Sequence, residues 1–326
     1  MDAPRPIVIF GPTAGGKSEL AVRLAEELGG EVLGADSMQV YRRLDAGTAK
    51  PEPALRQRAA HHLIDIVEPT EPFSAADWLA RADGLIEALR GRGVVPIVVG
   101  GTNLYLKLLL EGMFEGPGQD PAFRETLEGA AGEKLHAELE RVDPESAARI
   151  HPNNHKRLVR ALEVFHLTGT PISELQRQWG RERADRPYRH DPVLLGLRWA
   201  AEAINPRINL RVRAMFYPDK VDPKLAASVC IGGESLPEET RRLESAGWLG
   251  VQAREALGYK QVLRWVHGQW SLDEAFEQTK VQTRRFAKQQ RTWLRRFRGV
   301  SWLDAAELAP EARAQAALAA VRAEAR

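Results

Sequence analysis

The sequence predicts an α/β fold in which a parallel β-sheet is flanked by helices and interrupted by a helical insertion. Short apolar runs rich in Val and Ile alternate with amphipathic stretches over residues 6–101, and this alternation indicates a parallel sheet with helices on both faces. Residues 122–178 show a helical pattern without a convincing strand. The glycine- and proline-rich stretch EGMFEGPGQDP separates the two patterns at residues 111–121.

The strands are expected at apolar runs that read as buried parallel strands. In chain order these runs are Pro6–Phe10, 31–36, 61–67, Gly93–Gly101 and Asp191–Trp199. A helix is expected over Ser18–Leu28, because its apolar residues recur with the spacing of one helix face, and Gly29 and Gly30 end it. A second helix is expected over Ala75–Arg90, and the segments after the last strand are expected to be mostly helical.

A glycine-rich loop with the pattern GxxxxGKS follows the first predicted strand. Its glycines Gly11, Gly15 and Gly16 let backbone N–H groups approach phosphate oxygens, and the next helix directs its positive end to the same point. Lys17 adds a full charge, and the Ser18 hydroxyl can bind Mg²⁺. The strand–loop–helix order therefore predicts a phosphate site on a sheet of the P-loop NTPase-like kind.

The acid that usually accompanies such a loop is missing from its expected strand. P-loop ATPases hold Mg²⁺ with an Asp at the end of an apolar strand, whereas Gly93–Gly101 is followed by Thr102. Asp36 instead ends the second predicted strand, where open α/β sheets bind ligands. Asp36 is expected to be either a base or metal partner, or a residue that caps a helix or turn. The sequence pattern does not decide between these two roles. Asp65, between apolar neighbours, is expected to be structural or to support the site.

The segment Gln278–Trp302 contains no acidic residue and is expected to form a basic helix. Phe286, Trp293 and Phe297 lie among its cations, an arrangement that suits RNA, because arginine and aromatic planes stack on unpaired bases. The alternative is a solvated face whose aromatic residues enter the core; the length of the segment without a carboxylate favours RNA. One helical stripe comprises Lys280, Arg284, Lys288, Arg291 and Arg295.

Composition and charge further restrict the kind of protein that this chain can be. The net charge is only +2, so any basic patch must be local. The single cysteine, Cys230, excludes an intrachain disulfide framework and fits a reducing compartment. The N-terminus does not have the form of a signal peptide, and no stretch approaches the length of a membrane span. We expect a soluble cytoplasmic protein that does not bind membranes.

Seven stretches together resemble the tRNA dimethylallyltransferases, also called isopentenyl-diphosphate:tRNA transferases, of the bacterial type. They are GPTAGGKS, GADSMQVYRRLDAGTAKP, AHHLIDIVEPTEPFSAADW, PIVVGGTNLYLKLLLEG, RIHPNNHKRLVRALEVFHLTG, ALGYKQ and TRRFAKQQRTWLRR. They occur in the order of that family and run from the N-terminus to about Arg296. One such motif would be weak, but the ordered set is specific.

The resemblance implies transfer of a dimethylallyl group from dimethylallyl diphosphate to N6 of adenosine 37, in the anticodon stem-loop of tRNA. The loop would then hold a diphosphate leaving group and not ATP, with Mg²⁺ on Ser18 as the cofactor. Asp36 would be the general base, and Thr102 and Arg211 would complete the catalytic group. Arg207 is the alternative to Arg211 as the arginine that contacts diphosphate.

The resemblance also assigns two binding surfaces. The diphosphate would contact Gly11, Thr13, Ala14, Gly15, Gly16, Lys17 and Ser18. The tRNA would contact Asp36, Ser37, Met38, Gln39, Lys156, Arg157, Leu158, Val159, Arg160 and the stretch Glu255–Lys260, joined by Arg284, Lys288 and Arg291 of the basic stripe. We expect the protein to act as a monomer.

One segment departs from the family pattern. Phe216–Ile231 reads as an insertion before an acidic helix that resumes near Pro237, and its two prolines predict an ordered excursion or loop close to Arg211. We therefore expect a catalytic core of residues 1–115 and 190–304 that includes the basic helix, a tRNA-binding helical insertion of residues 116–189, and an alanine-rich tail of residues 305–326, which is a weakly packed or frayed helix.

Three other functions are weaker. A P-loop kinase acting on a small molecule explains the first part of the chain but not the acid-free basic segment. An RNA-binding protein gated by a nucleotide gives Asp36 and Thr102 no task. A prenyltransferase acting on free AMP would need neither the insertion nor the basic helix.

Overall fold

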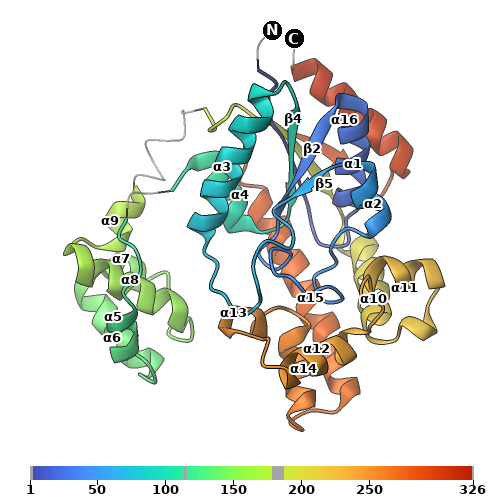
Figure 1. Ribbon diagram of the computed structural model, residues 1–326. Coiled ribbons are helices and arrows are strands. Elements are labelled where there is room, and N and C mark those ends of the chain that lie inside the picture. Colours follow the sequence, from blue (N-terminus) through green and yellow to red (C-terminus); the bar gives the residue numbers. More distant parts are fainter. Residues whose placement is uncertain (1–2, 114–115, 178–186, 325–326) are drawn as a thin grey trace. The chain divides into compact units, whose positions relative to one another are not determined.

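The computed structural model of the chain describes residues 3–113, 116–177 and 187–324 (Figure 1). It divides into two compact units, one formed by Met1–Leu110 with Arg189–Arg326 and the other by Glu111–Tyr188. Residues 114–115 and 178–186 around the predicted insertion, and residues 325–326 of the predicted tail, lie outside the described residues. No helix in the described ranges is long and apolar enough to cross a lipid bilayer.

The first unit is built on a six-stranded sheet in the order β3-β2-β4-β1-β5-β6. Its strands are β1 (Ile7–Phe10), β2 (Gly30–Ala35), β3 (His61–His62), β4 (Val95–Gly100), β5 (Val193–Arg198) and β6 (Val300–Asp304). Every neighbouring pair is parallel. Strand β1 lies between β4 and β5, and all four of its side chains are buried, as expected for a central strand covered on both faces. The predicted α/β fold with a parallel sheet is confirmed.

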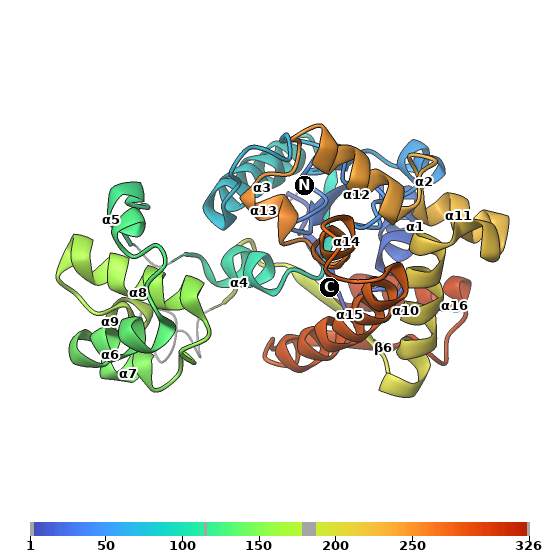
Figure 2. The same cartoon turned by 90° about the horizontal axis from the view of Figure 1, so that it is seen from below.

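Helices cover both faces of this sheet. The helices of this unit are α1 (Lys17–Leu28), α2 (Pro53–Arg58), α3 (Ala75–Gly91), α4 (Asn103–Glu111), α10 (Ala201–Phe216), η1 (Pro218–Lys220), α11 (Pro223–Val229), α12 (Leu236–Ser245), α13 (Val251–Arg254), α14 (Tyr259–Val266), α15 (Leu272–Leu294) and α16 (Pro310–Glu324). In Figure 1, α3 and α4 lie on one side of the sheet and α1, α2 and α16 on the other. Figure 2 shows α10 and α15 side by side, and this pair lies beyond the carboxyl ends of the strands.

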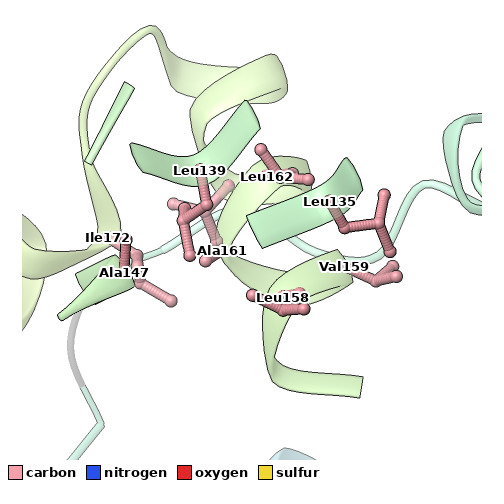
Figure 3. Packing of buried hydrophobic residues seen from close by; sticks show 9 residues of the cluster. Leu135, Leu139, Ala147, Leu158, Val159, Ala161, Leu162 and Ile172 are labelled. Atoms are coloured by element: carbon pink, nitrogen blue, oxygen red, sulfur yellow. The ribbon is translucent and has the colours of Figure 1, made fainter. Parts of the chain in front are cut away.

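The second unit consists of helices α5 (Pro121–Thr126), α6 (Gly132–Val142), α7 (Pro144–Ala147), α8 (His155–Thr168) and α9 (Ile172–Arg177). Its core joins α6 to α8 and α9, as the close view in Figure 3 shows; the core includes Leu135, Leu139, Leu158, Leu162 and Ile172. The buried carboxylate of Glu163 accepts hydrogen bonds from Arg124 and Arg160. These two cations lower the pKa of Glu163 to about 2 against the opposing effect of burial.

The third strand is much shorter than the sequence predicts. Only His61–His62 pairs with β2, and Asp65 adopts a left-handed backbone with φ 57°. Its carboxylate instead accepts hydrogen bonds from Lys50 and Arg56 at 2.6 and 2.8 Å. Lys50 is 2% exposed, and a buried ammonium group requires a partner of opposite charge. Asp65 is therefore structural, one of the two roles expected for it.

The predicted helix of Gln278–Trp302 is two elements. Helix α15 ends at Leu294, and after a turn at Gly299, with φ 61°, the chain enters β6 and pairs with β5. Trp302 faces Gly196 of β5, where a Cβ atom would come within 2.5 Å of the indole ring. The absence of a side chain at Gly196 thus makes room for a strand that the helical charge pattern concealed.

Two further segments form packed helices. The excursion over Phe216–Ile231 forms η1 and α11, which pack against α10. The alanine-rich tail forms α16, which packs against α1 with Ala314 and Ala317 buried. Small side chains allow two helices to approach closely, so the alanines that suggested a frayed helix form its contact face.

Candidate active site

A cavity of about 400 Å³ opens at the carboxyl ends of β1, β2 and β4. It is lined by residues 13–18 of the glycine-rich loop, Asp36, Gln39, residues 48–52, Gly100, Gly101, Arg207, Arg211 and Gln290. Strand ends, loop and helices α10 and α15 thus converge on one space. This is the position at which open α/β sheets bind ligands.

The glycine-rich loop presents its backbone to this cavity. Ala14 and Gly16 both adopt left-handed conformations, with φ 61° and 84°, and such a backbone is costly for alanine. Gly16 caps α1 without a side-chain hydrogen bond to the first turn, so the N–H groups there are available to an anion. Gly11 does not line the cavity: a Cβ atom there would lie 2.9 Å from Leu197, so this glycine serves strand packing.

Two cations face the cavity without an ion pair in the described part of the chain. The Lys17 ammonium donates to the Pro12 carbonyl at 2.8 Å, and the Arg211 guanidinium donates to the Thr13 hydroxyl. Burial is the main cause that lowers the pKa of Lys17 to about 8 and that of Arg211 to about 10, and the proximity of Arg211 lowers that of Lys17 further. Partly buried positive charge without an ion-pair partner, at the start of a helix, favours an anionic ligand.

Asp36 caps a turn, one of the two roles that the sequence leaves open, and its side chain also lines the cavity. Its Oδ1 accepts hydrogen bonds from the backbone N–H groups of Met38 and Gln39 at 2.9 and 3.3 Å, so it caps the turn after β2. Its Oδ2 has no hydrogen-bond partner among the described residues, and the side chain lines the cavity. The negative charge of the Asp36 carboxylate partly opposes the lowering of the Lys17 and Arg211 pKa values.

Thr102 supports this turn from β4. Its hydroxyl accepts a hydrogen bond from the Ser37 N–H at 3.0 Å, and its own N–H donates to the Ala35 carbonyl at 3.2 Å. Thr102 is not among the residues that line the cavity. Gln39 secures the other side, because its amide donates to the carbonyls of Thr48 and Ala49.

Gln290 is a site residue that sequence reasoning missed. Its side-chain oxygen accepts a hydrogen bond from the Thr13 N–H at 2.8 Å, and its amide donates to the Gly101 carbonyl at 2.8 Å. It is 2% exposed and ties α15 to the glycine-rich loop and to the end of β4. The available signal was its position: Gln290 lies on the face of α15 that buries Ala287 and Leu294.

The basic stripe of α15 is only partly free to bind a ligand. Lys280 pairs with Glu277, Arg284 donates to the Asn209 side chain, and Arg291 donates to the Trp199 carbonyl. Lys288 and Arg295 are exposed. Among the aromatic residues, Phe297 is buried against Phe10, whereas Phe286 is 37% exposed and lines the cavity.

The stretch Lys156–Arg160 belongs to the second unit and also contains both buried and exposed residues. Leu158 and Val159 are buried in its core, and Arg160 donates to the Pro117 and Gly118 carbonyls and to Glu163. The side chains of Lys156 and Arg157 are exposed. In the first unit, Glu255–Lys260 likewise contains a buried residue, Tyr259.

Comparison with known proteins agrees with this geometry. The family described as IPP transferase matches residues 39–297, and the one described as isopentenyl transferase matches residues 5–65. The tRNA dimethylallyltransferase of Geobacter sulfurreducens is 46% identical over 305 residues, which cover 91% of each chain. That of Geobacillus thermodenitrificans is 43% identical and covers 91% of this chain and 90% of its own.

Two solved structures are also similar. The tRNA delta(2)-isopentenylpyrophosphate transferase of Staphylococcus epidermidis has a TM-score of 0.68 and 32% identity, with 98% of this chain and 99% of its own covered. A eukaryotic dimethylallyltransferase acting on tRNA has a TM-score of 0.71 and 27% identity, with 93% and 74% covered. These likenesses extend over nearly the whole chain, including both units, and with the family match they show that it belongs to the tRNA dimethylallyltransferases.

Proposed function

We propose that this protein transfers a dimethylallyl group from dimethylallyl diphosphate to N6 of adenosine 37 in tRNA and releases diphosphate. One observation carries the proposal: Lys17 and Arg211, two half-buried cations without an ion pair among the described residues, share a cavity with a carboxylate oxygen of Asp36 that accepts no hydrogen bond there. The cations suit a leaving group that gains negative charge, and the carboxylate suits a nucleophile that loses a proton.

The leaving group would lie on the glycine-rich loop. Breaking the allylic C–O bond leaves the electron pair on a diphosphate oxygen, so negative charge grows there in the transition state. Lys17, Arg211 and the N–H groups at the start of α1 are held in place before the reaction. Fixed donors of this kind stabilise developing charge without reorganisation. The hydrogen bond to Thr13 on the cavity wall supports Arg211, rather than Arg207, as the arginine that contacts diphosphate.

The donor set also fits Mg²⁺. This ion keeps several waters in phosphate sites and takes only one or two protein oxygens besides the phosphates. The Ser18 hydroxyl lines the cavity next to Lys17 and would hold the ion. Bound there, Mg²⁺ would neutralise part of the charge on the diphosphate.

The accepting amine would be activated by Asp36. An adenine amino group is a poor nucleophile, and a carboxylate that takes its proton as the C–N bond forms lowers the barrier. The Oδ2 atom would accept that proton, because Oδ1 is held by Met38 and Gln39. Thr102 would act by holding the turn that positions Asp36.

The tRNA would be bound through exposed cations on each unit. On the first unit these are Arg285, Lys288 and Arg295 of α15, and on the second they include Lys156 and Arg157. Phosphate contacts of this kind supply most of the affinity for nucleic acids. Adenosine 37 must leave its stack to reach the cavity, and the exposed ring of Phe286 at the cavity wall offers a stacking surface.

The direct test uses dimethylallyl diphosphate labelled in its hydrocarbon part, with bulk tRNA, with free AMP and with ATP plus tRNA in separate reactions. We expect label only in tRNA, at the adenosine next to the anticodon, and release of one diphosphate for each group transferred. Conversion of ATP to ADP without prenylated tRNA would instead favour a P-loop kinase. Label in AMP but not in tRNA would assign a free-nucleotide prenyltransferase.

A further inference from the structure

Three side chains lie against the backbone of the glycine-rich loop, and two of them, Trp199 and Arg313, are not among the residues that line the cavity. The Trp199 indole N–H donates to the Gly15 carbonyl at 3.1 Å. The Arg207 Nε donates to the Ala14 carbonyl at 3.0 Å, with its guanidinium 5.1 Å from the centre of the Trp199 ring. Arg313 of α16 lies 5.8 Å from the same ring. The indole is thus in contact range of two guanidinium groups.

Arg313 also reaches the loop itself. A Cβ atom on Gly16 would lie 2.7 Å from the Nη1 of Arg313, and a Cβ atom on Gly15 would lie 3.1 Å from the Nε1 of Trp199. The two glycines are therefore required on the side of Trp199 and Arg313 as well as on the cavity side. Gly16 has φ 84°, which a residue with a side chain rarely adopts.

Burying the Arg313 guanidinium without an ion pair among the described residues costs free energy, and a purely structural role does not explain this cost. Arg313 is 8% exposed, and its Nη2 donates to the carbonyls of Ala305 and Leu308. Burial and the nearby Arg207 both lower its pKa. Two neighbouring guanidinium groups create a positive potential that favours negative charge. A buried arginine beside a second arginine is therefore stabilised most when an anion binds nearby.

The hydrogen bond from Trp199 has a direct effect on the cavity side. A peptide unit is planar, so its C=O and N–H groups point in opposite directions. Fixing the Gly15 carbonyl towards Trp199 directs the Gly16 N–H to the opposite side of the loop. Arg313 restrains the indole that makes this bond and adds positive charge behind the same peptide.

We propose that Arg313 is a positioning residue for the diphosphate-binding loop, which it holds through Trp199 and Gly16 in the conformation that receives the leaving group. The matched IPP transferase segment ends at residue 297, so α16 lies outside it. The inference rests on the proposed function, in which this loop binds the diphosphate of the prenyl donor.

The test measures binding of inorganic pyrophosphate with Mg²⁺ by calorimetry, and binding of tRNA by filter retention in the same preparations. Loss of the support given by Arg313 in Arg313→Ala should raise the pyrophosphate Kd by about tenfold, the scale of one or two hydrogen bonds, and leave the tRNA Kd unchanged. Arg322→Ala, an exposed arginine on the same helix, is the control and should change neither. A wild-type pyrophosphate Kd in Arg313→Ala would overturn the proposal.

A second variant keeps the test decisive if Arg313→Ala is poorly folded. Trp199→Phe retains an aromatic ring but loses the N–H that holds Gly15, so it should weaken pyrophosphate binding alone. The double variant should weaken pyrophosphate binding by less than the product of the two single effects, because Arg313 acts in part through the indole of Trp199. Equal weakening of pyrophosphate and tRNA binding in both single variants would show general damage and reject the role. Failure of the wild type to bind pyrophosphate would reject the proposed loop function itself.

Discussion

The two carboxylate oxygens of Asp36 suit two different roles, a turn cap and the proposed general base. Oδ1 is held by two backbone N–H groups, and this fixes the side chain in one orientation towards the cavity. A catalytic group whose rotamer is fixed by its surroundings loses little entropy when the substrate arrives. The capping role would therefore support the proposed catalytic role.

Asp36→Asn separates these roles. The amide oxygen can still accept the hydrogen bonds from Met38 and Gln39, but the side chain can no longer take a proton at neutral pH. We expect the single-turnover rate of prenyl transfer to fall by about 10²- to 10⁴-fold, the usual contribution of a general base. The tRNA Kd should stay close to that of the wild type, and pyrophosphate should bind no more weakly, because a negative charge near its site is removed. A rate close to that of the wild type would exclude Asp36 as the base.

The lowered pKa of Lys17 predicts how pyrophosphate binding depends on pH. Its pKa of about 8 in the free protein means that the ammonium charge is present below pH 8 and is lost as the pH rises above it. Bound pyrophosphate favours the charged form, so binding at pH 8.5 should take up protons. Calorimetry in buffers of different ionisation enthalpy measures this uptake.

The matched variant for this prediction is Lys17→Met, because pyrophosphate itself titrates in the same range. The advantage in affinity of the wild type over Lys17→Met should shrink between pH 7 and pH 9. The variant should also lack the part of the proton uptake that belongs to Lys17. A constant ratio of the two Kd values across this range would contradict the assigned pKa.

At the scale of elements, α12 and α14 hold the loop that forms one wall of the cavity. The Glu239 carboxylate is 1% exposed; it accepts hydrogen bonds from Tyr259 and from the N–H groups of Asp45 and Ala46. Burial raises the pKa of Glu239 to about 7, despite these hydrogen bonds. The same loop continues to Thr48 and Lys50, which line the cavity.

This raised pKa gives stability a predictable pH dependence. Because the folded pKa exceeds the unfolded value near 4.5, the contribution is complete below pH 4.5 and is lost as the pH rises through 7. Between pH 5 and pH 8, the wild type should lose more free energy of unfolding than Glu239→Gln does, by at most on the order of 3 kcal/mol. Urea unfolding measures this difference, with Glu87→Gln, an exposed site on α3, as the control. Equal losses in the wild type and Glu239→Gln would contradict the prediction.

The secondary-structure elements also show which parts of the fold and the site can be predicted from the sequence. The buried strands β1, β4 and β5 and the loop before α1 follow from local patterns, because apolar runs and glycine spacing are properties of neighbouring residues. The strand β6 and the packing of α16 do not, because they depend on Gly196 of β5 and on the surface of α1, which are distant in the sequence. For the same reason, local patterns could mark Lys17 and Asp36, whereas Gln290 and Arg313 depend on long-range contacts.

At the scale of the whole molecule, exposed cations occur on both units. Arg285 and Lys288 lie on the exposed side of α15 in the first unit, and Arg157 is exposed at the start of α8 in the second. If one tRNA contacts both units, each group of cations contributes its own phosphate contacts. Contacts at separate sites contribute to the binding free energy additively.

Salt dependence tests whether both units bind the same RNA. Each phosphate contact contributes about 0.7 to 0.9 to the slope of log Kd against log salt concentration. Arg285→Ala with Lys288→Ala should therefore reduce that slope by about 1.5, and Arg157→Ala by about 0.8, with the two reductions adding in the triple variant. The control variant combines Arg92→Ala, just after the end of α3, with Arg322→Ala on α16. Both arginines are exposed, and this variant should leave the slope unchanged. An unchanged slope in Arg157→Ala would remove this arginine from the tRNA surface, and a wild-type slope in the α15 pair would make that helix face merely solvated.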